Sequence, residues 1–269
     1  MNSMMQLFIN TEELFDRLPS APIVEAVIDI RTRSGSELEE TSVKAKLADK
    51  LDGYQFLDSQ RGVRIQHEFR AGNEEQPLPE IRDLGWKGLR YQSDDKKHIV
   101  QFNRDGFVFS RLEPYESWDS LYVESMRLWQ IYIQIAQPDA IDRIGLRYIN
   151  RILPPVGLLN LEDYFVQAPT VLTDLDLPFA GFMHQDTLSV PGYPYAINVV
   201  RTIQPSMDPI NSKVGLILDI DVFMTKSLEL NEEELKNCLL EMRWLKNKVF
   251  YGSLTPSALA LCNDSENVK

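Results

Sequence analysis

The chain has 269 residues, of which 43% are hydrophobic and 25% are charged, as in ordinary globular proteins with a sizeable core. Its formal net charge is −12, and a field of that sign repels nucleic acid from the surface as a whole. It contains no apolar run of the roughly 18–20 residues that a membrane-spanning helix needs. The start of the chain lacks the features of a signal peptide. We therefore expect a cytoplasmic protein that binds no membrane, and a basic protein partner is easier to accommodate than nucleic acid.

Two cysteines, Cys238 and Cys262, are the only ones in the sequence, and both fall in apolar helical patterns. They indicate a reducing compartment rather than a disulfide framework. The sequence has no glycine-rich phosphate-binding motif and no G-x-S-x-G nucleophile motif. We therefore expect no cofactor, and favour a protein that is not an enzyme.

The elements expected in the first half follow from hydrophobic periodicity and from turn residues. They are a short helix over 11–18, a strand over 23–31, an amphipathic helix over 37–51, a strand over 61–70, a polar loop over 71–80, strands over 88–93, 98–103 and 107–112, and a long helix over 117–136. An Asp-Gly pair at 105–106 predicts a hairpin between the last two strands.

The second half is expected to begin with a strand over 143–152. It continues with a short helix over 161–166, an irregular stretch over 167–181, strands over 182–190, 196–203 and 213–224, a long helix after Asn231, and a short terminal helix over 255–262. Asn231 is followed three residues later by a glutamate, which is typical of a helix start.

Residues 22–136 and 143–250 share this order of elements, although their sequences are not visibly alike. We therefore predict an α+β protein with two topologically similar halves, 1–138 and 139–269. Each half would be an antiparallel sheet with a long amphipathic helix on one face, and the two sheets could join edge to edge. A single continuous α+β domain is the alternative.

The segment 142–152 reads DRIGLRYINRI and places three arginines on one side of a strand. Residues i, i+2 and i+4 of a strand share a face, so Arg143, Arg147 and Arg151 lie together, with Gly145 and Ile149 between them. Three aligned arginines in an acidic protein require either carboxylate partners or an anionic ligand.

Both explanations remain open from the sequence. Carboxylates on nearby strands could pair with the arginines across the sheet, each pair contributing about 0.2–1 kcal/mol. The available carboxylates are Glu25, Asp29, Asp219 and Asp221. Alternatively, Arg143, Arg147 and Arg151 could hold a phosphate or carboxylate group bidentately.

Two further arrangements could carry chemistry. Asp219 and Asp221, two residues apart, are candidates for holding Mg²⁺, although they lie within a strand and not at its end. His184 and Asp186 share a strand face and could form a general base, with Ser189 as a nucleophile, but surface roles explain them equally well.

Three segments together resemble a known family. They are APIVEAV at 21–27, GLRYINRI at 145–152, and LDID at 218–221 followed by a helix ending in KNKVF at 246–250. The chain resembles a sporadically distributed, uncharacterised family of prokaryotic proteins of about this length. The patchy distribution implies mobile genes, which often belong to defence or toxin-neutralising modules. The resemblance assigns no site residues.

The sequence thus predicts a non-enzymatic binding or regulatory protein that recognises another protein, within a bacterial defence or toxin-neutralising module. The alternative is an enzyme or sensor that binds a phosphorylated small molecule or nucleic acid through the arginine and carboxylate face. In the alternative these side chains converge on an open pocket, whereas in the first case they pair with each other.

Overall fold

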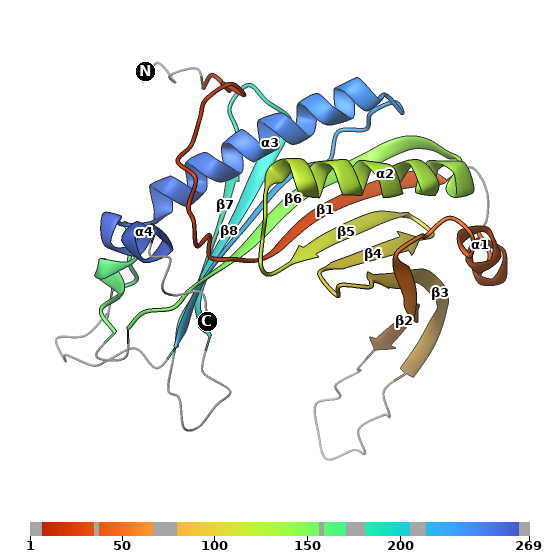
Figure 1. The fold of residues 1–269 in the computed structure, drawn as a ribbon, viewed down its shortest axis with the longest axis horizontal. Helices are drawn as coiled ribbons and strands as arrows, with labels where there is room; N and C mark the ends of the chain where they lie inside the picture. The colour runs from red at the N-terminus through yellow and green to blue at the C-terminus, as the bar shows by residue number, and fades with distance from the viewer. Residues whose placement is uncertain are drawn as a thin grey trace, which may run out of the picture.

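A computed structural model describes residues 7–34, 38–66, 80–155, 159–170, 181–204 and 214–263. Within these ranges nine strands form one antiparallel sheet in the order β2-β3-β4-β5-β1-β6-β9-β8-β7 (Figure 1). The strands are β1 (Ile23–Ser34), β2 (Tyr54–Gln66), β3 (Glu80–Ser93), β4 (His98–Asn103), β5 (Gly106–Leu112), β6 (Pro138–Ile152), β7 (Met183–Ser189), β8 (Tyr195–Gln204) and β9 (Gly215–Met224). The predicted α+β class is confirmed.

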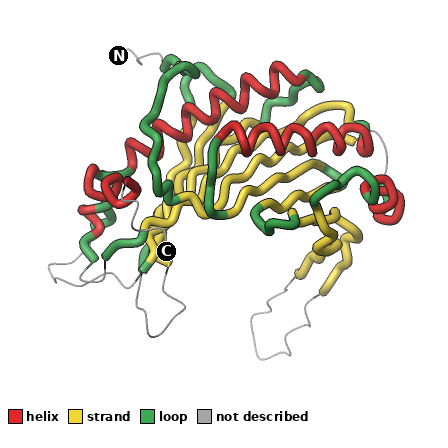
Figure 2. Tube along the Cα trace, in the orientation of Figure 1, coloured by secondary structure: helices red, strands yellow, loops and turns green. Residues whose placement is uncertain are grey.

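The two long helices lie on the same face of the sheet (Figures 1 and 2). The helices are α1 (Glu40–Leu47), α2 (Trp118–Ala136), α3 (Glu232–Ser253) and α4 (Pro256–Asn263), with a 3-10 turn, η1 (Leu161–Asp163). Ser117 caps α2 by accepting a hydrogen bond from the Ser120 backbone N–H. Asn231 caps α3 in the same way, as the sequence predicted.

The strands at the centre of the sheet alternate strictly between two environments. One side of β1, β6 and β9 packs against α2 and α3, and we call this side the helix face. Its side chains are buried and include Ile28, Ile30, Leu146, Tyr148, Leu218 and Ile220. They belong to one core cluster that also contains the buried side chains of α2 and α3. The alternation explains why apolar and polar residues take turns along these strands.

The opposite side of the same strands, which we call the open face, carries mostly half-buried side chains. No helix in the described ranges covers it (Figure 2). The β2–β3 hairpin bends away from the helix layer at one end of the sheet. It exposes the apolar side chains of Val63, Ile81 and Leu84.

Two expectations about the strands need correction. The prediction gave each half a sheet of its own, but β1 pairs with β6 and joins all nine strands into one sheet. The strand expected over 61–70 begins at Tyr54, and β3 begins at Glu80 instead of at residue 88. Three register shifts between β2 and β3 break the alternation there, which hides these strands in the sequence.

The helix expected over 11–18 is wrong, because this segment is a turn followed by extended chain. Its Glu13 carboxylate accepts hydrogen bonds from Trp244 Nε1 at 2.6 Å and Lys248 Nζ at 2.5 Å, which fasten it to α3. Leu14, which the helix would have buried, is 94% exposed. The short helix expected over 161–166 is only the η1 turn, and most of the loop expected over 71–80 lies outside the described residues.

No helix in the described ranges is both long enough and apolar enough to cross a lipid bilayer.

We predict that the chain unfolds in one cooperative transition, because one sheet and one core cluster span residues before and after α2. Denaturant unfolding followed by far-UV circular dichroism and by tryptophan fluorescence should give coincident curves. Two separate transitions would show that residues 1–138 and 139–269 are independent domains.

Candidate functional site: the charged open face

The open face brings the predicted arginine row together with carboxylates from both neighbouring strands. β6 pairs with β1 on one side and with β9 on the other. The side chains of the open face on these strands are Glu25, Val27, Asp29 and Arg31 from β1, Arg143, Gly145, Arg147, Ile149 and Arg151 from β6, and Ile217, Asp219, Asp221 and Phe223 from β9.

Arg143 links three strands. Its Nη1 donates to Asp29 Oδ2 on β1 at 3.0 Å, and its Nη2 donates to Asp221 Oδ2 on β9 at 3.4 Å. Asp29 also holds Arg31, with Arg31 Nε at 2.9 Å from Asp29 Oδ1. Arg31 and Arg143 stand opposite each other in the register, where like charges repel, so the carboxylate of Asp29 between them neutralises the repulsion.

Gly145 gives the Arg143 guanidinium its place. A Cβ atom at position 145 would lie 2.7 Å from Arg143 Nη1, so a larger residue cannot coexist with this side-chain position. The guanidinium carbon also lies 5.3 Å from the centre of the Phe223 ring on β9, a cation–π contact. The glycine in the GLRY segment therefore allows Arg143 to lie flat on the sheet.

Arg147 forms a two-point ion pair with one carboxylate of β9. Its Nε donates to Asp219 Oδ1 at 2.8 Å and its Nη2 donates to Asp219 Oδ2 at 2.5 Å. The hydrogen bond to Asp219 raises the pKa of Arg147. Arg147 is also directly opposite Asp221 in the register. Burial raises the pKa of Asp221, and the attraction of Arg143 and Arg147 only partly offsets this.

Arg151 turns away from the other two arginines. Its Nη2 donates to both carboxylate oxygens of Glu113, at 3.1 and 2.9 Å, in the segment that follows β5. Its aliphatic stem passes over Gly215, where a Cβ atom would lie 3.3 Å from Arg151 Cγ. The three predicted anion-binding arginines are thus each held by a different set of carboxylates.

This arrangement is an ion-pair network, as the first of the two sequence interpretations required. Glu113 and Arg31 belong to the network but were not singled out from the sequence. Arg31 could have been found, because it shares a strand face with Asp29. Glu113 could not, because it lies outside any strand and reaches Arg151 only in the folded chain. Whether an anion can displace the carboxylates stays a prediction.

The metal candidates Asp219 and Asp221 lie on the same face of β9, and arginines approach both. Among the described residues, no group of three or more histidine, cysteine, aspartate or glutamate side chains is arranged to hold a metal ion.

His184 and Asp186 do interact, with His184 Nε2 at 3.1 Å from Asp186 Oδ1. Asp186 also accepts a hydrogen bond at 2.7 Å from Arg201 Nη2, whose side chain is almost fully buried. Ser189 is an odd number of residues away on β7 and points to the other face of the sheet. The arrangement therefore fastens β7 to β8 and does not bring a nucleophile to His184.

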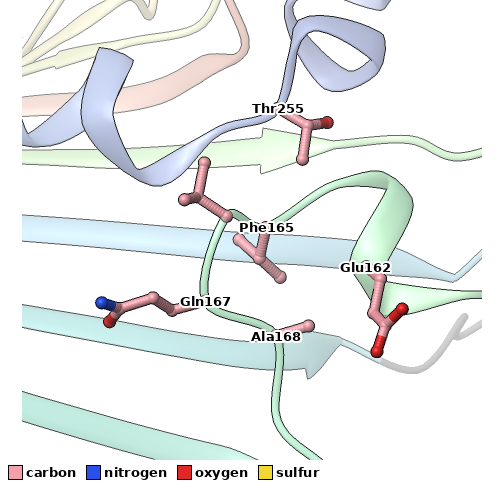
Figure 3. Close-up of a pocket in the computed structure, with 6 residues that line it drawn as sticks. Glu162, Phe165, Gln167, Ala168 and Thr255 are labelled. Carbon is pink, nitrogen blue, oxygen red and sulfur yellow. The ribbon is translucent and has the colours of Figure 1, made fainter.

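A cavity of about 590 Å³ lies apart from the open face, between η1 and the start of α4 (Figure 3). Glu162, Phe165, Val166, Gln167, Ala168 and Thr255 line it. Glu162 is its single ionisable side chain, so the lining offers no pair of groups for acid–base chemistry.

Comparisons with protein-family models, with curated proteins and with solved structures find no match to this chain. The resemblance to a prokaryotic family therefore stays a prediction.

Replacing Gly145 with alanine should destabilise the protein by about 1–3 kcal/mol, because the new methyl group displaces the Arg143 guanidinium from Asp29 and Asp221. In an Arg143→Ala background the same change should be neutral or slightly stabilising, since alanine suits a strand better than glycine. Chemical denaturation of the four proteins in this double-mutant cycle measures the coupling. Additive losses would show that Gly145 does not act through Arg143.

The raised pKa of Asp221 predicts an unusual pH dependence. A folded-state pKa above the ordinary value of 3.8 means that folding favours the protonated carboxyl. Its contribution to stability is therefore largest below that value and is lost as the pH rises through the folded-state pKa. Asp221→Asn should remove this dependence and leave stability at pH 7 equal or higher, whereas Asp219→Asn should lower it because Arg147 loses its two-point partner. A loss of stability with Asp221→Asn that grows with pH would contradict the assignment.

Proposed function

We propose that the protein is a non-enzymatic binding protein that recognises another protein through its open face. The observation that carries this proposal is the ion-paired network of Arg143, Arg147 and Arg151 on a sheet face that no described helix covers. Pairing holds the charged groups in place before any partner arrives, which lowers the entropic cost of association.

The composition of the open face supports protein recognition. Apolar side chains alternate with the charges, and those of Val27, Ile149, Ile217 and Phe223 are half-buried. Protein interfaces combine such apolar patches with arginine and with polar rims. The exposed apolar side chains of the β2–β3 hairpin, Val63, Ile81 and Leu84, extend the surface at one end.

Charge favours a basic partner. Carboxylates on and beside the open face outnumber its arginines: Glu25, Asp29, Asp105, Glu113, Asp219 and Asp221 against Arg31, Arg143, Arg147 and Arg151. The net charge of −12 adds a long-range attraction for a basic protein.

We also propose that the chain consists of two topologically similar halves. β1 pairs antiparallel with β5, the strand that precedes α2, and β6 pairs antiparallel with β9, the strand that precedes α3. The first strands of the two units pair antiparallel with each other, as a two-fold axis through the sheet requires. α2 contacts β1 and β5, and α3 contacts β6 and β9. Duplication of one strand–meander–helix unit accounts for this order.

The setting we propose is the bacterial cytoplasm, within a defence or toxin-neutralising module. Two free cysteines, Cys238 and Cys262, fit a reducing compartment. The assignment to such a module rests on the resemblance in sequence alone.

The alternative, a phosphorylated small molecule or nucleic acid bound by Arg143, Arg147 and Arg151, would require the anion to displace the carboxylates of Asp29, Asp219 and Glu113. No observation on the open face favours that exchange over the existing pairs.

Affinity capture from the native host with an open-face variant tests the proposal. Ile149 lies between Glu25 and Asp219 in the register, so an arginine placed there finds carboxylate partners while it adds bulk and positive charge. Val123 on α2 is 65% exposed and serves for the matched control. Ile149→Arg should lose a stoichiometric basic protein that wild type and Val123→Arg both retain, as read by mass spectrometry.

Retention of that protein by Ile149→Arg, with a folded circular-dichroism spectrum, would show that recognition uses another surface. A phosphorylated small molecule that elutes with wild type and is lost in Ile149→Arg would favour the alternative.

A further inference from the structure

We propose that the start of α2 and the middle of α3 form a binding site for the phosphate group of a small molecule. Arg243, Lys246 and the hydroxyl pair of Tyr115 and Tyr148 build the site. It lies on the helix face, on the opposite side of the sheet from the open face, and does not depend on the protein recognition proposed above.

Arg243 and Lys246 are one turn apart on α3, so their side chains share a side of the helix. The Arg243 guanidinium carbon lies 5.4 Å from the centre of the Trp118 ring, at the first residue of α2. Lys246 Nζ lies 4.0 Å from the centre of the Tyr148 ring on β6. Figure 1 shows the beginning of α2 beside the middle of α3, where these contacts bring both cations together.

Neither cation has a carboxylate partner among the residues that the structure describes. Both side chains are half-buried. Other half-buried or buried arginines each hold a carboxylate, as Arg90 holds Asp58 and Arg201 holds Asp186. Burial and then the neighbouring charge of Arg243 lower the pKa of Lys246 to about 7. Two like charges brought together in a partly dehydrated place are costly unless an anion neutralises them.

Tyrosine hydroxyls add a further donor. The hydroxyl oxygens of Tyr115 and Tyr148 are 3.1 Å apart, so one donates to the other. The second hydroxyl hydrogen remains, and no acceptor for it is found in the described ranges. The site therefore offers guanidinium, ammonium and hydroxyl donors against the indole of Trp118. The N-terminal end of α2 adds its positive dipole.

The nearest carboxylates do not neutralise the cations. Glu116 accepts hydrogen bonds from Arg111 Nη2 at 2.7 Å and from the Ser120 hydroxyl at 3.2 Å, so its oxygens are engaged. Asp119 is exposed in the first turn of α2 and acts electrostatically on Tyr115. In the described structure it forms no ion pair with Arg243 or Lys246. Arg111 contributes further positive charge behind Tyr115.

A phosphate group fits this set of donors better than a carboxylate does. A planar carboxylate is satisfied by one arginine, whereas a tetrahedral dianion can use the guanidinium of Arg243, the ammonium of Lys246 and a hydroxyl at once. Binding of a dianion would favour the charged form of Lys246 and so raise its pKa.

The reactivity of the Lys246 amine provides the test. Full-length protein is treated with acetic anhydride at pH 7, with and without millimolar inorganic phosphate at equal ionic strength, and acetylation is measured by peptide mass spectrometry. A pKa raised by one unit from about 7 cuts the free amine, so phosphate should slow acetylation of Lys246 about fivefold. Lys236, exposed on the same helix, is the internal control and should be unaffected.

Arg243→Gln should abolish the protection, and Tyr115→Phe, which keeps the ring and removes one hydroxyl, should weaken it if Arg243→Gln does not fold. Absence of protection at Lys246, or equal slowing at Lys236, would overturn the proposal. Equal protection by acetate would overturn the choice of phosphate as the ligand.

Discussion

The antiparallel pairing of β1 with β6 at the centre of the sheet is the interaction on which the rest of the structure depends. It aligns Ile28 with Leu146 on the helix face and Asp29 with Gly145 on the open face. The core and the charged network are therefore set by the same register. A slip of one residue in either strand would move its apolar side chains to the open face and its charges into the core. Burial on one side thus determines which charges meet on the other.

Within that register, side-chain size decides where the charges lie. Gly145 leaves room for the Arg143 guanidinium, which reaches carboxylates on two strands at once. Arg147 and Arg151 lie at positions that alternate regularly along β6, but they bind carboxylates from different segments, Asp219 and Glu113. The network is consequently a mosaic of fixed pairs, which suits a surface that another protein recognises.

Regular alternation made much of this predictable. β4 coincides with the predicted strand over 98–103, and α2 begins one residue after the predicted start because Ser117 is its cap. The arginine row and its ion-pair interpretation also followed from period-two spacing. What the sequence missed has physical causes. Bulges hide the early parts of β2 and β3, and side-chain contacts with α3 hold residues 11–18 extended against their helical pattern.

Contacts between distant segments were beyond the sequence in principle. The partner of Arg151 and the position of Lys246 over Tyr148 depend on how helices and strands pack, and no local pattern carries that information. The chain thus offers two different charged surfaces. On the open face each arginine of the predicted row already has a carboxylate, whereas between α2 and α3 two cations lie together and have none in the described structure.

In-cell photo-cross-linking tests the central claim, recognition through the open face, most directly. A photoreactive phenylalanine analogue at Phe223 lies on the open face, and the same analogue at Phe8, which is 77% exposed in the N-terminal segment, reports nonspecific contact. The account predicts that Phe223 cross-links to one basic protein of the native host and that Phe8 does not. Cross-links to that protein only from Phe8, or the same cross-links from both positions, would contradict it.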